Sequence, residues 1–274
     1  MSGILICILV DEVCCLKDNQ DDKKQIFGMI PNIIAFAISL AIAYFLKWEV
    51  RDLVWSLWFC SLMLGYLTLL SYLGAGAYIG LRIIKQEDFD RKKRIPTIVI
   101  GAAVGIFLLA FFSIHFGGFH AVHSVFLQSF FPVDGVPTDG FGRAFINPPL
   151  LVFMAFNYLL TPYGLFLIPT VIVERNHIFK PLVTIFTGFN DPEGHIPDTF
   201  TGVVNKNDLG KNPLGEAMLK PYVNVVRMHL LIFFFAISYA LKIDSFIVYG
   251  AVYFVYFFPW SDIRKLFKKQ HAGG

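Results

Sequence analysis

Three of the seven histidines lie within nine residues, at His115, His120 and His123. Imidazole is costly in hydrocarbon, and an intramembrane histidine usually faces the interior of a helix bundle. On an α-helix, the i,i+3 spacing of His120 and His123 lets two rings reach one metal ion or bond to each other. His115 and His123 are about 12 Å apart along a straight helix, so they share one ion only if Gly117-Gly118 breaks it. This segment is the first candidate metal site.

Arg227 and His229 form a second cluster in a later apolar stretch. Together they can hold an anionic cofactor such as haem, with histidine as axial ligand and arginine on a propionate. Methionine and carboxylate ligands are scarce in the apolar stretches, so a mainly nitrogenous site would suit haem, copper, iron or zinc. The expected metal ligands are His115, His120, His123 and His229. The expected cofactor-binding residues are Arg227 and His229.

Three other interpretations stay open at this point. The histidines can be structural, bonded to backbone or water, and Arg227 can simply anchor its helix at the interface. Polar side chains beside a break in a membrane helix can line a path for a solute, so a small-solute transporter or channel is the second interpretation. The residues concerned lie beside Pro162 and are Asn157, Tyr158, Thr161 and Tyr163. Such groups more often form hydrogen bonds between helices. A non-catalytic subunit of a larger membrane complex fits the 30 phenylalanines and the lack of a nucleophile–base pattern. Whether the chain is an enzyme is left open.

The composition defines the environment in which these residues act. The chain has 274 residues, of which 56% are apolar and 16% charged, and its mean hydropathy is +0.62. A soluble domain is about 25% charged, so a soluble globular enzyme is improbable. Four cysteines are too few for a disulfide scaffold. The basic residues form no face interleaved with aromatic residues, so nucleic-acid binding has no support. The expected partner is the lipid bilayer, with other membrane subunits or a homo-oligomer as further partners.

Six uncharged stretches predict an all-α polytopic bundle of about six transmembrane helices, because about 20 residues cross the hydrocarbon. The expected spans are Ile26–Leu46, Leu53–Leu81, Pro96 to His115 or on to Phe131, Ala144–Val173, Tyr222–Leu241 and Ile243–Trp260. Trp55 and Trp58 lie near one end of the second span, where an interfacial aromatic belt would sit. Pro162 and Pro169 predict a kinked fourth span.

Basic residues predict the orientation. With six spans, 18 of the 23 lysines and arginines fall on the side of both termini, four fall on the other side, and Arg227 lies inside a span. The positive-inside rule therefore predicts both termini in the cytoplasm of a cell-membrane (inner-membrane) protein. The expected organisation is an interfacial segment 1–25, a transmembrane domain 26–260 with a cytoplasmic loop at 175–220, and a basic tail 261–274. Within the loop, Ile178–Phe186 is apolar enough to lie on the membrane surface.

The sequence resembles a family of uncharacterised prokaryotic multi-pass membrane proteins known only as a domain of unknown function. The resemblance rests on His115-Phe116-Gly117-Gly118-Phe119…Val122-His123 and on Pro221-Tyr222…Arg227-Met228-His229-Leu230, within residues 30–268. It implies no established activity, but it points to His115, His123 and His229 as the positions to test. The family's Trp-x-Glu-Asn motif is replaced here by Trp58-Phe59-Cys60-Ser61, which lacks the acid.

Overall fold

The computed structural model describes residues 29–85, 90–137 and 139–188, together with Val226, Leu230, Phe233, Phe234, Ile237, Leu241, Gly250 and Phe254. Every regular element in these residues is helical, which confirms the all-α prediction. The chain divides into two compact units, Met1–Lys47 with Ile247–Gly274, and Trp48–Phe246. Each unit is described by itself.

In the first unit, an apolar helix covers Met29–Phe45, within the predicted first span. Its 17 residues correspond to about 25 Å of helix. Ser39 Oγ donates to the Ala35 carbonyl at 2.8 Å, which satisfies the hydroxyl inside the helix itself. The helix ends where Lys47 takes a left-handed conformation (φ 54) and its N–H donates to the Tyr44 carbonyl.

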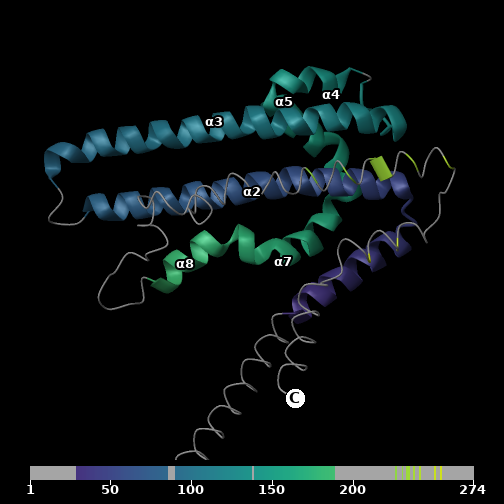
Figure 1. The fold of residues 1–274 in the computed structure, drawn as a ribbon, viewed down its shortest axis with the longest axis horizontal. Coiled ribbons are helices and arrows are strands. Elements are labelled where there is room, and N and C mark those ends of the chain that lie inside the picture. The colour runs from purple at the N-terminus through teal and green to yellow at the C-terminus, as the bar shows by residue number, and fades with distance from the viewer. Residues whose placement is uncertain are drawn as a thin grey trace, which may run out of the picture. The chain divides into compact units, whose positions relative to one another are not determined.

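The second unit is built on two long helices that run side by side, α2 (Val50–Lys85) and α3 (Arg91–Phe130) (Figure 1). Asp52 caps α2 because its Oδ2 accepts from the Glu49 N–H at 2.9 Å. Asp90 caps α3 because its Oδ1 accepts from the Lys92 N–H at 2.9 Å. The third span thus begins at Arg91, earlier than the predicted Pro96. Asp90 accepts a backbone N–H of the first turn, and proline is tolerated near the start of a helix.

The contact between α2 and α3 is concentrated in the C-terminal half of α3. The buried residues of α3 run from Phe112 to Leu127, whereas the preceding half is largely exposed. Gly65 of α2 lies against the fully buried Phe116 ring, which stacks on Phe112 at a centroid distance of 4.5 Å. The absence of a Cβ at Gly65 is therefore what lets the two backbones approach. Gly117 and Gly118 do not break α3, which stays helical through both.

Shorter helices cover the two long ones. A hairpin-like segment of α4 (Gly140–Arg143), the 3₁₀ turn η1 (Ala144–Ile146) and α5 (Pro148–Met154) lies against α3 (Figure 1). The chain then crosses in a broken span made of η2, a π-helix at Ala155–Leu159, α6 (Leu160–Tyr163), the 3₁₀ turn η3 (Gly164–Phe166) and α7 (Leu167–Ile178).

The helix α8 (Lys180–Gly188) follows α7 and lies inside the predicted loop at 175–220. Its Ile185 is 2% exposed and packs with Ala75 and Ile79 of α2, with Leu182 beside them. The segment expected on the membrane surface is thus a helix anchored by its apolar side chains to α2. The fourth span also ends at Ile178, five residues later than predicted.

Three helical stretches of the described residues are long and apolar enough to cross a membrane: Val50–Lys85, Arg91–Phe130 and Pro148–Ile178. They correspond to the predicted second, third and fourth spans. The fifth and sixth predicted spans lie largely outside the described residues.

Candidate functional site

The three histidines of α3 occupy different environments. His120 and His123 are 1% and 5% exposed, whereas His115 is exposed. His115 stacks on Phe111 at 5.7 Å and meets the edge of Phe119 at 5.2 Å. The segment therefore separates into a buried part facing α2 and an aromatic stripe on the outer face of the helix.

His120 is held by hydrogen bonds at both ring nitrogens. Its Nδ1 lies 3.0 Å from the Phe116 carbonyl oxygen, and its Nε2 lies 3.2 Å from Ser61 Oγ. Because a carbonyl only accepts, Nδ1 carries the proton, and in the neutral ring Nε2 accepts from the Ser61 hydroxyl. Metal binding through His120 would require breaking one of these bonds, so its geometry is that of a structural histidine.

Two tryptophans fix α3 against α2 on either side of His123. Trp58 Nε1 donates to the His120 carbonyl at 3.0 Å, and Trp55 Nε1 donates to the Phe131 carbonyl at 2.7 Å. Both tryptophans are fully buried. Both lie near the start of α2 as expected, but they do not form an exposed aromatic belt, because their rings are buried and their indole N–H groups bond inside the helix bundle.

The described residues contain no group of three or more His, Cys, Asp and Glu side chains arranged to hold a metal ion. The His120 and His123 ring centroids are 6.4 Å apart. Arg227 and His229, the expected cofactor-binding pair, lie outside the described residues. Of the expected metal ligands, His115, His120 and His123 are described and belong to no such group, whereas His229 lies outside the described residues.

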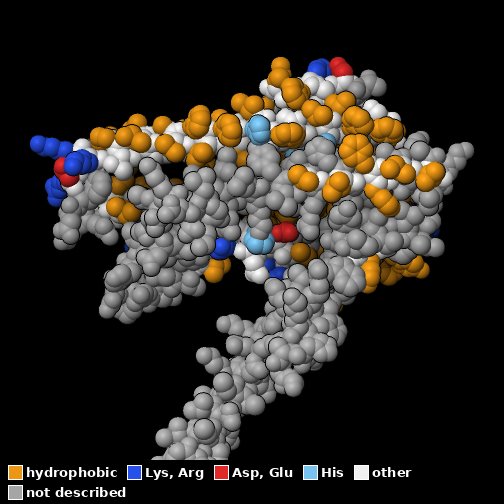
Figure 2. Space-filling view, in the orientation of Figure 1, with side chains coloured by type: hydrophobic (Ala, Val, Ile, Leu, Met, Phe, Trp, Pro, Cys, Tyr) orange, Lys and Arg blue, Asp and Glu red, His pale blue; other side chains and the backbone are white. Residues whose placement is uncertain are grey.

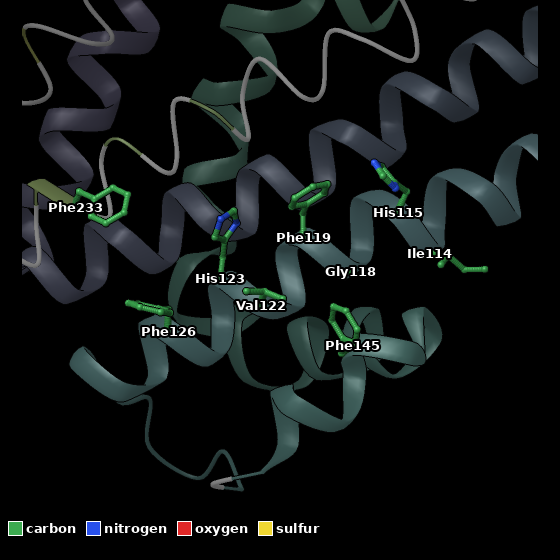
Figure 3. Close-up of a pocket in the computed structure, with 9 residues that line it drawn as sticks. All are labelled: Ile114, His115, Gly118, Phe119, Val122, His123, Phe126, Phe145 and Phe233. Carbon is green, nitrogen blue, oxygen red and sulfur yellow. The ribbon is translucent and has the colours of Figure 1, made fainter.

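His115 and His123 nevertheless line one pocket with a volume of about 520 Å³. His115, Phe119 and His123 project from one face of α3, Phe145 comes from η1, and Phe233 closes the pocket from a distant part of the sequence (Figure 3). The complete lining is Ile114, His115, Gly118, Phe119, Val122, His123, Phe126, Phe145 and Phe233. The pocket is therefore apolar and aromatic, with two imidazoles as its titratable groups.

One end of the pocket, at His115, lies beside the middle of the α2 apolar stretch. The uncharged part of α2 is 53–81, so its centre falls near Tyr66. The Tyr66 ring contacts the rings of Phe112 and Phe116 at 5.8 and 6.2 Å, and His115 lies between these two residues in α3. His115 is thus level with the centre of a membrane-length helix, where an imidazole usually has a specific role.

The polar residues predicted around Pro162 are not gathered in one place. Tyr163 is 4% exposed and its hydroxyl donates to Asp52 Oδ1 at 3.1 Å, which joins the broken span to the start of α2. Asn157 and Thr161 are exposed, and Asn157 lies inside the π-helix. Tyr163 is therefore an interhelical contact, while Asn157 and Thr161 present polar groups on an otherwise apolar span.

Sequence reasoning did not single out Ser61, Phe145 and Phe233 as parts of the histidine environment. Ser61 is 59 residues from His120, and Phe145 follows α4 on a short turn. No local spacing links these residues to α3. Only the abundance of phenylalanine, already visible in the composition, hinted at an aromatic wall.

These features define the class of protein: an all-helical membrane protein whose third span carries a histidine-lined apolar pocket. The chain belongs to the family of unknown function DUF6498, which matches residues 21–257. This finding agrees with the resemblance to an uncharacterised family. No curated protein and no solved structure matches the chain.

Proposed function

We propose that this membrane protein binds haem, or a metal ion, through intramembrane histidines. The observation that carries the proposal is that His115 and His123 line the same apolar pocket. Its volume falls within the range of roughly 300–1,000 Å³ typical of small-molecule sites. Aromatic walls with one or two imidazoles suit a flat, largely apolar cofactor that takes histidine as its axial ligand.

Haem is favoured over a bare ion by the composition of the pocket. A bound divalent ion needs three or four converging ligands, and the described residues provide no such group. Haem needs one or two axial imidazoles and an apolar slot. Phe233 lines the pocket and follows His229 by four residues in the sequence, the spacing of neighbours on one face of a helix, so His229 is the candidate second axial ligand. Arg227 is the candidate partner of a propionate.

The test is the absorption spectrum and metal content of the purified full-length protein. The expected result is a Soret band that shifts or disappears in His123→Ala and His229→Ala, because each change removes a proposed axial ligand. Phe145→Leu keeps the pocket apolar and serves as the matched control that should retain the band. Colourless, metal-free protein after expression with added haem would refute the proposal.

The broken fourth span favours a second candidate function, the passage of a small solute. Discontinuous helices with polar groups beside the break often line transport paths, and π-helical turns often occur at functional sites. Asn157 lies in the π-helix and is exposed on an apolar span. In a background without the four native cysteines, Asn157→Cys should react with a small, charged thiol reagent from the water phase if this position lines a path. A thiol that reacts only with a membrane-permeant reagent would exclude this function.

A further inference from the structure

The end of the hairpin formed by α2 and α3 carries a concentration of positive charge. Residues 82–94 contain six basic side chains and three acidic ones. The basic residues are Arg82, Lys85, Arg91, Lys92, Lys93 and Arg94. Figure 2 shows basic side chains gathered at this end of α3, next to its apolar surface.

The four consecutive basic residues of α3 form a ring and not a one-sided patch. Arg91, Lys92, Lys93 and Arg94 are separated by about 100° each around the helix axis, so they point in all directions. Arg91, Lys92 and Lys93 are exposed and form no ion pair in the described part of the chain. A ring of this kind meets negative charge on every side of the helix, which a globular partner docking on one face would not supply.

The ring adjoins an apolar surface of α3 that is exposed on all sides. Ile95 is 73% exposed, and Val99 and Ile100 are 60% and 63% exposed. This arrangement places the cations at the boundary between hydrocarbon and headgroups once the apolar surface lies in the bilayer. The first turn of a helix also favours anions, whereas here it carries four cations and no acidic residue after the Asp90 cap. An external anion would relieve this unfavourable arrangement.

We propose that this basic ring binds the headgroups of anionic phospholipids in the leaflet that the α2–α3 turn reaches. Each basic residue near a membrane surface favours anionic lipid by about fivefold. The ring would therefore enrich anionic lipid around α3 and fix the depth of the helix in the bilayer. This inference is independent of the proposed haem site.

The test uses the full-length protein equilibrated with equimolar phosphatidylcholine and phosphatidylglycerol, with retained lipids identified by native mass spectrometry. Wild-type protein should retain phosphatidylglycerol in excess. In the triple variant R91Q/K92Q/K93Q, the ratio of retained phosphatidylglycerol to phosphatidylcholine should fall at least about fivefold. In the wild type, 500 mM NaCl should lower the same ratio. The matched control K47Q/R143Q/K242Q removes the same charge from other positions and should keep the excess.

Each alternative has its own outcome. An unchanged lipid ratio in the triple variant, or a wild-type ratio that does not respond to salt, would overturn the proposal. Displacement of phosphatidylglycerol by millimolar inorganic phosphate would indicate a free-phosphate site and would equally overturn it. The salt titration uses wild-type protein, so the proposal stays falsifiable if the triple variant does not fold.

Discussion

Burial separates two kinds of histidine on the same helix. His120 faces α2, and both of its nitrogens are bonded, to Phe116 and to Ser61. Its ring also packs against Phe116 at 4.3 Å and Trp58 at 5.7 Å. His115, five residues earlier, lies on the outer face and lines the pocket. One histidine therefore holds the helix pair together, while the other is exposed at the wall of the pocket.

His120→Ala should destabilise the protein by about 2–4 kcal/mol, because it leaves a cavity in a filled core and removes the partner of Ser61. His115→Ala should change stability by less than about 0.5 kcal/mol in ligand-free protein, because the side chain is exposed. The measurement is the free energy of unfolding of both variants in the same detergent. Equal destabilisation by the two changes would contradict the structural role of His120.

Gly65→Ala is expected to be destabilising at the crossing of α2 and α3. A Cβ there would overlap the Phe116 ring, which is fully buried and has little room to move. Overpacking of this kind costs about 1–3 kcal/mol, more than alanine gains in helix propensity. The control is Gly101→Ala in α3, where a Cβ would meet nothing within 4 Å and stability should stay equal or rise by up to about 1 kcal/mol. The measurement is the thermal unfolding of both variants. An unchanged stability of Gly65→Ala would contradict the close contact between Gly65 and the Phe116 ring.

At the scale of elements, the length of each uncharged stretch was enough to predict a helix but not to predict where that helix is interrupted. The second, third and fourth spans could be predicted because charged residues such as Arg51 and Arg82 bound them and hydrocarbon demands continuous apolar sequence. The π-helix at Ala155–Leu159 could not, since no local pattern marks it and its contact with α2 exists only in three dimensions. The docking of α8 was missed for a similar reason: Ile185 and Ala75 are 110 residues apart and meet only in three dimensions.

Tyr163→Phe tests how the broken span is held to α2. The change removes the hydroxyl that donates to Asp52 Oδ1 and leaves the ring contact with Trp48 at 5.8 Å in place. A hydrogen bond to a charged group contributes about 1.5–3 kcal/mol, so a loss of that size is expected. Tyr158→Phe removes a hydroxyl from the same span that does not bond to Asp52, and it should be close to neutral. A comparison of urea midpoints in detergent separates the two, and equal midpoints would show that the Tyr163 bond contributes nothing.

For the whole molecule, the two long helices exceed the bilayer. α2 has 36 residues and α3 has 40, which correspond to about 54 and 60 Å of helix against about 30 Å of hydrocarbon. The helices must therefore tilt or extend beyond the hydrocarbon. A single crossing by each of the antiparallel helices α2 and α3 predicts that the C-terminus of α2 with the N-terminus of α3, and the α4 region, lie on opposite sides of the membrane. The positive-inside rule then predicts that the end of this helix pair that carries the excess of basic residues faces the cytoplasm.

That orientation predicts opposite labelling of two single cysteines. In a background in which Cys7, Cys14, Cys15 and Cys60 are replaced by alanine, Lys85→Cys should react with a membrane-impermeant maleimide only after the cytoplasmic side is opened. Gly142→Cys should react in intact cells, because Gly142 is exposed and a side chain there meets nothing within 4 Å. Lys85 is likewise exposed at the last turn of α2, so a difference between the two reflects the side of the membrane and not burial. Labelling of both positions from the same side would contradict a single crossing by α3, and reversed labelling would place the basic turn outside and overturn the predicted cytoplasmic termini.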